Sequence, residues 1–527
     1  MAVSLRRATA LVLGLTLTVN VLNYLRDAAL AARFGAGPAS DALFSALLLP
    51  AILQQMLVAG TLAPAVVPIY LELRRYSPAQ ARRLIWQVLL GVAAALIPLA
   101  ALAVLLTPAL VNLLFPGFDA ATQAMTVQAL RFFLPGAICL ILAGLTGALL
   151  NAHEHFFVPA LTPGLGSAVV LGLLLLQPDV SVPELALALA LAMGAQLLLH
   201  LPGLLRAASP GRAPWSAAAP PAWPNRAPWR RVLMLSLPLF AYVSLSQITT
   251  LVERVFASHL GAGAVARLTL AQKLSSLPLF LVAGSLAVVI FPRLAALHVD
   301  RDAFSAALAA GLRSALPLLL ISTAWLISGS QLLVTLLYQH GRFSPQDAAL
   351  TAALLQGYAL GLTPAGVGAI LLKALHARQD VRSPLWVAAI SLTGYLALAA
   401  LGSRLWGALG LALALSATAL ISTSLLAAAL VQRHHALAWR HLLHDLQALL
   451  PGALAALAAG WLAETWLRPL LGAALPALLL RLLTLALAGG GVFLLRARRA
   501  GFVAGDPRAW LARVRWRRAA PIPRSKA

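Results

Sequence analysis

Charged side chains lie inside or at the ends of long apolar segments, where they could bind an anionic group or pair with each other. Arg26 and Asp27 are adjacent near the end of the first apolar segment, and Asp41 follows at the start of the second. Ionisable groups in a membrane are costly, so they usually face a cavity or a partner. The pattern therefore indicates a polar cavity for an anionic headgroup. The alternative is that Arg26 and Asp27 merely pair or cap a helix end near water.

A matching set of polar side chains occurs in the second half of the chain. Glu253 and Arg254 fall where Asp27 lies in the first half, and further polar residues open the next apolar segment. Arginine meets phosphate as a bidentate fork and lysine as a point charge. We therefore add Glu253, the polar residues that open the next segment, and two amides from the middle of the second segment to the candidate substrate contacts. They are Gln54, Gln55, Glu253, Arg267, Gln272 and Lys273.

No motif of a soluble enzyme is present. The sequence has no Walker A pattern, and Gly35-Ala-Gly37 is too short for a dinucleotide fingerprint; it is typical of a turn that ends a helix. Cys139 is the one cysteine, so neither an intramolecular disulfide nor a cysteine-based metal site can form. Loop histidines lack a supporting carboxylate cluster. We expect no catalysis, no metal and no cofactor.

The composition excludes a soluble domain. Of 527 residues, 61% are hydrophobic and only 10% are charged, whereas soluble domains are about 25% charged. A bilayer core takes about 20 apolar residues per helix, which divides the chain into about fourteen spans. Continuous apolar runs favour helices over strands. The first run continues toward Arg26, so we interpret it as a membrane helix rather than a cleaved signal peptide.

The basic residues predict the orientation in the membrane. Most of the 39 Lys and Arg residues fall in the N-terminal tail, in every second loop and in the C-terminal tail. The opposite loops hold only Arg33, Arg342, Arg404 and Arg468. This asymmetry follows the positive-inside rule and places both termini in the cytoplasm. The net charge of +24 is thereby explained without a nucleic-acid partner.

Short strings recur in order at nearly constant spacing. Phe34-Gly-Ala-Gly37 recurs as Leu260-Gly-Ala-Gly263, and Val58-Ala-Gly-Thr-Leu-Ala63 as Val282-Ala-Gly-Ser-Leu-Ala287. A weaker match joins Leu149-Leu-Asn-Ala-His153 to Ala374-Leu-His-Ala-Arg378. We infer two homologous lobes of about six helices, related by a pseudo-two-fold axis along the membrane normal, with a cavity between them.

These patterns divide the chain into five parts. The lobes span 1–205 and 230–432, joined by a cytoplasmic linker, 206–229, that is rich in Pro, Ala and Trp. Two additional helices occupy 433–496, and a basic tail occupies 497–527. In the tail, tryptophans alternate with arginines from Asp506 to Arg518, which suits either an amphipathic segment on anionic membrane lipids or a disordered tail.

Several strings between about residue 10 and residue 430 are distinctive. The first are Leu25-Arg-Asp-Ala28, Arg33-Phe-Gly-Ala-Gly37, Ser40-Asp-Ala42, Ala59-Gly60, Val67-Pro68, Pro116-Gly-Phe118 and Gly147-Ala-Leu-Leu-Asn151. The later ones are Gly261-Ala-Gly-Ala-Val265, Leu337-Tyr-Gln-His-Gly-Arg-Phe343, Asp347-Ala348 and Arg378-Gln-Asp380. Together they resemble the MurJ/MviN family, the lipid II flippases of bacterial peptidoglycan synthesis.

The resemblance implies a function. It implies an inner-membrane transporter of fourteen helices with cytoplasmic termini, in which cavity arginines hold the diphosphate of a polyprenyl-linked saccharide. The lipid tail would lie in a groove near the last two helices. The partners implied are the undecaprenyl-diphosphate type of lipid, membrane lipids, and proteins of cell-wall or exopolysaccharide synthesis.

The sequence departs from the family at several cavity positions. Asn20 replaces a usual arginine, Gln54-Gln55 a pair of arginines, and Ala59 a usual glutamate. Gln272-Lys273 replaces an Asp-Arg pair, whereas Arg26, Asp27 and Asp41 are kept. The reduced charge leaves several readings open: flipping of lipid II by alternating access, flipping of another lipid-linked oligosaccharide for exopolysaccharide export, a drug/cation antiporter, or an inactive scaffold.

Overall fold

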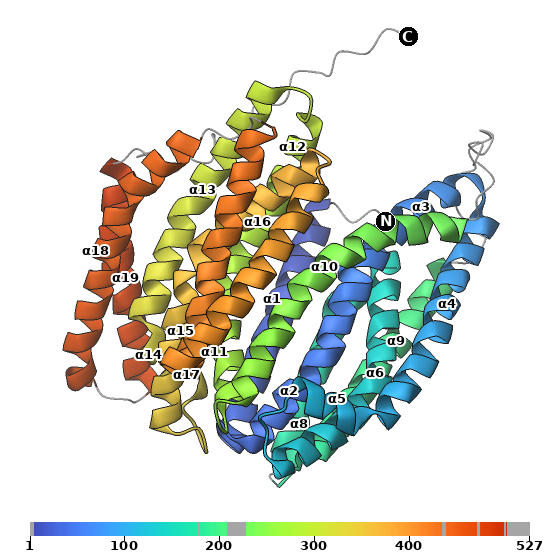
Figure 1. Ribbon diagram of the computed structural model, residues 1–527, viewed down its shortest axis with the longest axis horizontal. Coiled ribbons are helices and arrows are strands. Elements are labelled where there is room, and N and C mark those ends of the chain that lie inside the picture. Colours follow the sequence, from blue (N-terminus) through green and yellow to red (C-terminus); the bar gives the residue numbers. More distant parts are fainter. Residues whose placement is uncertain are drawn as a thin grey trace. The chain divides into compact units, whose positions relative to one another are not determined.

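The computed structural model is helical throughout the residues that it describes, which are 5–177, 179–207, 228–434, 439–471, 475–499 and 502 (Figure 1). No strand occurs in these ranges. Most of the linker and of the basic tail, including Asp506 to Arg518, lies outside the described residues. The all-α membrane fold predicted from the continuous apolar runs is confirmed.

The helices follow one another with short connections. The first group is α1 (Leu5–Phe34), α2 (Pro38–Gln54), the π-helix η1 (Gln55–Leu62), α3 (Ala63–Tyr76), α4 (Pro78–Leu105), α5 (Thr107–Leu114), α6 (Ala120–Ala152), α7 (Phe157–Leu161), the 3₁₀ turn η2 (Thr162–Gly164), α8 (Leu165–Leu176) and α9 (Val182–Ala207). The second is α10 (Pro228–Ser258), α11 (Ala264–Pro278), the π-helix η3 (Leu279–Gly284), α12 (Ser285–Ala296), α13 (Arg301–Ser328), α14 (Ser330–Tyr338), α15 (Pro345–Leu360), α16 (Leu362–Ala377), α17 (Arg382–Gln432), α18 (Trp439–Leu471) and α19 (Leu475–Arg499).

The described helices provide enough apolar length for many membrane crossings. Ten are long and apolar enough to span a bilayer, and the bent pair α15–α16 raises the number to 11. The 51-residue α17 contains a non-helical Gly407, where two helices meet, and α1 and α10 add 30 and 31 residues. The expected total of about fourteen spans is consistent with this arrangement.

The sequence repeats share the same backbone irregularities. Gly35 and Gly261, at matching places in the first repeat, both have positive φ, at 65° and 86°. The second repeat lies on the π-helices η1 and η3. In the third, the non-glycine residues Glu154 and Gln379 have φ of 63° and 58°. An apolar composition alone would not produce these matches in φ and in π-helical backbone. They therefore support the weak third sequence repeat.

Spatial contacts divide the chain into two compact units. The first contains 1–272, 337–354 and 384–415, and the second contains 273–336, 355–383 and 416–527. The lobes predicted from the repeats, 1–205 and 230–432, are defined by sequence similarity rather than by contact. Their boundaries stay a prediction.

The first unit has an apolar core at one end of its helices. Tyr70 and Leu73 of α3 pack with Leu84 and Ile85 of α4, and Val232 of α10 joins the same cluster. Nearby, His200 of α9 is buried and lies within hydrogen-bond distance of the hydroxyl groups of two threonines from α6 and η2. The α9 helix is therefore fixed by both apolar packing and a satisfied polar network.

In the second unit, α18 and α19 form a hairpin beside α13 (Figure 1). A buried ion pair joins Arg481 of α19 to Glu464 of α18, and Arg313 of α13 pairs with Asp445 of α18 at 2.7 Å. The buried pair Arg481–Glu464 stabilises one register of α18 and α19, since displacing either partner leaves a buried charge without its counter-ion. Arg313 is exposed, and only its partner Asp445 is buried.

Candidate functional site

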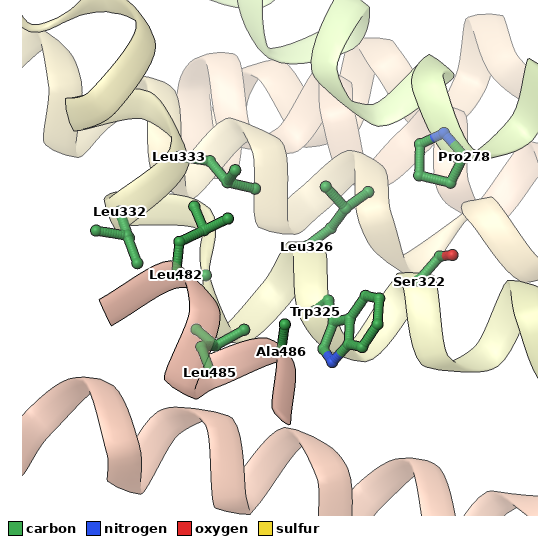
Figure 2. A pocket seen from close by; sticks show the side chains of 10 residues that line it. Pro278, Ser322, Trp325, Leu326, Leu332, Leu333, Leu482, Leu485 and Ala486 are labelled. Carbon is green, nitrogen blue, oxygen red and sulfur yellow. The ribbon is translucent and has the colours of Figure 1, made fainter. Parts of the chain in front are cut away.

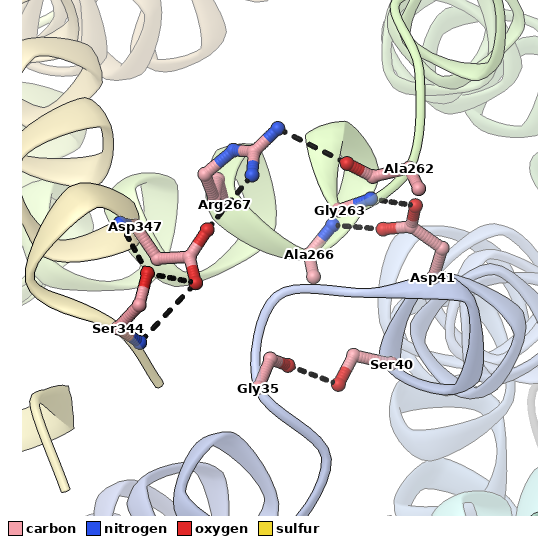
Figure 3. A network of polar contacts seen from close by, with 9 residues as sticks. All are labelled: Gly35, Ser40, Asp41, Ala262, Gly263, Ala266, Arg267, Ser344 and Asp347. Atoms are coloured by element: carbon pink, nitrogen blue, oxygen red, sulfur yellow. Dashed lines mark hydrogen bonds and ion pairs between the residues drawn. The ribbon is translucent and has the colours of Figure 1, made fainter. Parts of the chain in front are cut away.

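The Asp41 carboxylate binds the N-terminus of α11 in the first unit. It accepts the backbone N–H groups of Gly263 at 2.6 Å and Ala266 at 2.7 Å (Figure 3). Asp41 is 1% exposed. The first turn of a helix carries unpaired N–H donors and a partial positive charge, so a buried carboxylate is well placed there.

Glycine at the helix start allows this approach. Gly263 precedes α11 and has no side chain to cap it, so Asp41 of α2 supplies the carboxylate from outside the helix. Gly263 has φ of 80°, and a Cβ at this position would overlap the carbonyl oxygen of Ala36. The two repeated Gly-Ala-Gly strings thus meet backbone to backbone.

A third segment completes the contact. The Arg342 N–H donates to the Ala32 carbonyl at 2.7 Å, and a Cβ on Gly35 would lie 2.7 Å from the Arg342 carbonyl oxygen. We call the region formed by residues 32–41, 260–267 and 341–347 the junction. Its parts come from both predicted lobes, and all of it lies in the first unit.

Arg267 ties the junction to the start of α15. Its guanidinium pairs with Asp347 at 3.0 Å and also donates to the Ala262 carbonyl at 3.2 Å (Figure 3). The other Asp347 oxygen accepts the Ser344 hydroxyl at 2.8 Å, and the Ser344 hydroxyl accepts the Asp347 N–H. Asp347 therefore serves both as a capping-box residue of α15 and as the counter-ion of Arg267.

Further predicted site residues form two smaller groups. Arg26 and Asp27 pair at 2.8 Å, with the carboxylate nearly fully buried and the guanidinium partly exposed. Arg254 is 4% exposed and donates to Gln272 at 3.2 Å and to the Val265 carbonyl at 3.3 Å. The pairing of Arg26 with Asp27 matches the simpler alternative considered for them, and the partial exposure of Arg26 leaves the binding role as a proposal.

The other candidates are more scattered. Glu253 is buried, Asn20 and Gln54 are half-buried, and Gln55 is exposed. Lys273 is half-buried and begins the second unit, so it is described separately from the junction. The structure thus brings Asp41 and Arg267 into one junction and pairs Arg254 with Gln272. It shows no such shared site for Asn20, Gln54 and Gln55 among the described residues.

Five residues that contribute to this region are not among the substrate contacts predicted from the sequence. Arg254 lies next to Glu253 on α10 and is buried, but the repeat matches it to the uncharged Ala28, so the repeat gives it no role. Asp347 and Ser344 form a Ser-x-x-Asp string before an apolar run, which is a recognisable helix-capping signal. The backbone donors of Gly263 and Ala266 have no side-chain pattern that could announce them.

The second unit contains an apolar cavity of about 170 Å³ (Figure 2). Trp325 and Leu326 of α13, Leu333 of α14, and Leu482 and Leu485 of α19 line it. The indole N–H of Trp325 is buried and has no hydrogen-bond partner in the described part of the chain. Most of the residues that line the cavity are apolar, and Ser322 is the one with a polar side-chain hydroxyl. The cavity can therefore accept hydrocarbon.

Comparison with known proteins identifies the family. The family model described as "Lipid II flippase MurJ" matches residues 30–480. The chain belongs to the MurJ family. The lipid II flippase MurJ of Burkholderia cenocepacia is 30% identical over 397 residues, which cover 73% of this chain and 76% of that protein. The probable lipid II flippase MurJ of Vibrio cholerae is 27% identical, covering 80% of this chain and 82% of that protein.

Solved structures agree on the fold of the MurJ family. A structure titled "Lipid II flippase MurJ, inward closed conformation" superposes with a TM-score of 0.76 at 22% identity, covering 93% of this chain and 98% of that one. An inward-facing multidrug resistance MATE family transporter of the MOP superfamily gives 0.65 at 14% identity, covering 79% of this chain and 95% of the other. These structures share the fold of this chain, and its membership of the MurJ family makes it a multi-span membrane transporter rather than a catalytic enzyme.

Proposed function

We propose that the protein flips a polyprenyl-diphosphate-linked saccharide, with the peptidoglycan precursor lipid II as the leading substrate, from the cytoplasmic to the periplasmic leaflet of the bacterial inner membrane. The observation that carries this proposal is the junction, taken together with membership of the MurJ family. The bonds of Asp41 close one end of the first unit, yet they are few enough to break and re-form. Alternating access needs such a reversible closure.

The distribution of basic residues supports a periplasmic position for the junction. Both termini and the Lys/Arg-rich loops are cytoplasmic by the positive-inside rule. The junction loops fall on the opposite side, where only Arg33, Arg342, Arg404 and Arg468 lie. A closed junction then seals the periplasmic end while the headgroup enters from the cytoplasm.

Arg26 and Lys273 are the proposed contacts of the diphosphate. The Arg26 guanidinium is partly exposed although it pairs with Asp27, so it can turn its remaining donors to an anion. Asp27, Asp41, Glu253 and Arg267 shape the surrounding charge, and Asn20, Gln54, Gln55 and Gln272 are proposed as hydrogen-bonding groups for the saccharide. Neutral amides favour sugar hydroxyls over phosphate.

The apolar cavity beside α19 is the proposed place of part of the polyprenyl tail. Leucine, alanine and tryptophan supply seven of its ten lining residues, and Pro278, Ser322 and Gly329 supply the rest. In this cavity the isoprenoid methyl groups would pack against α13 and α19 instead of against membrane lipids. This position agrees with the tail groove expected near the last two helices.

A second candidate function is flipping of a different lipid-linked oligosaccharide for exopolysaccharide export. The observation that favours it is the replacement of usual cavity arginines by Asn20, Gln54 and Gln55. A cavity with fewer fixed cations holds a diphosphate less tightly. Interaction with cell-wall or exopolysaccharide synthesis proteins would follow from whichever substrate is correct. A drug/cation antiporter has less support, because it would favour more buried carboxylates and fewer buried cations.

Complementation tests the proposed function. The chain should restore growth to a strain depleted of its lipid II flippase, and Arg26→Ala and Lys273→Ala should each reduce rescue. Arg131→Ala is the matched control, because Arg131 is an exposed arginine on α6. Failure of the well-expressed wild-type chain would contradict the lipid II proposal. Full rescue by both alanine variants would contradict the assigned contacts.

A further inference from the structure

One peptide group at the start of α11 lies between two buried side chains of opposite charge. The N–H of the Val265–Ala266 peptide donates to Asp41 at 2.7 Å. The C=O of the same peptide accepts from Arg254 Nη1 at 3.3 Å. Asp41 is 1% exposed and Arg254 is 4% exposed. The two charges are therefore joined through a single peptide dipole in a region that excludes water.

Such an arrangement strengthens both hydrogen bonds. A cation at the carbonyl oxygen withdraws electron density from the peptide and makes its N–H a better donor, and the carboxylate has the converse effect. The low dielectric around both groups enlarges the effect. Removing either charge leaves the other buried with a weaker partner, which is costly.

Arg254 also connects two helices. It lies on α10, and its second nitrogen donates to Gln272 of α11 at 3.2 Å. The guanidinium thus contacts α11 at Val265 and again almost two turns later. These contacts hold α10 and the beginning of α11 as one rigid hairpin, and they do not depend on Asp41.

We propose that Arg254 is a positioning residue of the junction, which sets the strength of the Asp41 closure through the Val265–Ala266 peptide. When the junction opens, Asp41 loses its two N–H partners, whereas Arg254 keeps its contacts with α11. The hairpin then moves as a unit. This inference rests on the proposed function, in which the junction opens and closes during transport.

A double-mutant cycle on the full-length protein in membrane vesicles tests the inference. The native Cys139 is replaced by serine, and a cysteine replaces Ala264, which is 1% exposed at the start of α11. The rate of labelling by a membrane-impermeant maleimide then reports opening. Asp41→Asn and Arg254→Gln should each raise the rate, by roughly tenfold. The labelling rate of the double variant should be little higher than that of the faster single variant.

The outcomes separate the two proposals. If Asp41→Asn leaves labelling unchanged, the closure itself is wrong. If Asp41→Asn raises the rate but the effects of the two substitutions on the labelling rate multiply in the double variant, the closure by Asp41 is supported and the role of Arg254 is wrong. A merely structural arginine would act independently of Asp41.

Two further variants protect the test against misfolding. Gln272→Leu removes one contact of Arg254 but leaves the Arg254 charge at the Val265 carbonyl. It should therefore raise the labelling rate less than Arg254→Gln does. Arg404→Gln changes an exposed arginine and should leave the rate unchanged. Equal labelling of Gln272→Leu and Arg254→Gln would contradict the role of the guanidinium at the peptide carbonyl.

Discussion

At the scale of residues, the buried Asp41 and the half-buried His153 illustrate two different uses of a polar group. Asp41 binds two backbone N–H donors of a distant helix and so joins segments from both predicted lobes. His153 follows α6 and hydrogen-bonds the hydroxyl of Tyr70 on α3. The first contact lies in the junction that we propose to open during transport, whereas the second joins neighbouring helices within one predicted lobe.

His153 predicts a pH dependence of stability. Burial, together with the positive charges of Arg74 and His155, lowers the pKa of His153 to about 4. In the unfolded chain a histidine titrates near about 6.5. Between these values the unfolded chain binds a proton that the folded chain does not, so stability falls as the pH decreases from about 6.5 toward 4 and then levels off.

Thermal unfolding of the detergent-solubilised protein at pH 7 and pH 5 measures this effect. The unfolding midpoint should fall at pH 5, and His153→Gln should reduce that fall. His259→Gln is the control, because His259 is exposed. An unchanged pH dependence in His153→Gln would show that other groups cause it.

At the scale of elements, the backbone irregularities position the site. The positive-φ glycines turn the chain at the junction, and the π-helices interrupt α2–α3 and α11–α12 at matching places in the repeats. π-helical turns often occur at functional sites. In the first unit, η1 packs against α10, with Gly60 at the contact.

Gly261 and Gly263 provide a matched pair of substitutions at the junction. Both have positive φ, so alanine costs about 1–2 kcal/mol of backbone strain at either position. Only at Gly263 would the new Cβ overlap the Ala36 carbonyl; nothing lies within 4 Å of a Cβ on Gly261. Gly263→Ala should therefore increase cysteine labelling at position 264, and Gly261→Ala should not. Equal labelling of both variants would contradict the close backbone contact.

Gly60 predicts a second steric effect with a rescue. A Cβ on Gly60 would overlap the Val243 side chain of α10, so Gly60→Ala should lower the unfolding midpoint and the transport rate. Val243→Ala in the same chain should restore both, since it removes the overlapping methyl groups. Gly91→Ala is the control, because a Cβ there meets nothing within 4 Å. Failure of the rescue would place the cause elsewhere.

Much of the fold could be predicted from the sequence, but less of the site could. Long apolar runs determine where helices must lie, and helices account for nearly all of the residues that the structure describes. The π-helices could not be predicted. Their backbone hydrogen bonds are spaced differently from those of an α-helix, but the hydropathy of the sequence does not change at the same place. The charge of Asp41 at the start of an apolar segment makes it a candidate site residue. Its partners could not be predicted, because backbone N–H groups carry no sequence signal and the contact joins residues far apart in the chain.

At the scale of the whole molecule, charge and apolar area have separate roles. The apolar 61% of the chain builds the membrane helices, and most of the 39 basic residues lie in the segments predicted to face the cytoplasm. Few remain for a cavity. Arg254 donates to the Val265 carbonyl of the junction, and Arg481 pairs with Glu464, which further reduces the number of cations available to a substrate. The proposed transporter thus has a lightly charged cavity and a polar closure.

A transport assay in proteoliposomes tests the central claim most directly. Fluorescent lipid II is placed in the inner leaflet, and its arrival in the outer leaflet is measured by an impermeant quencher, beside a lipid-linked saccharide with another headgroup. We predict that the wild-type protein moves lipid II, that Arg26→Ala slows it several-fold and that Arg131→Ala does not. No movement of lipid II by a folded protein that moves the other saccharide would contradict the account.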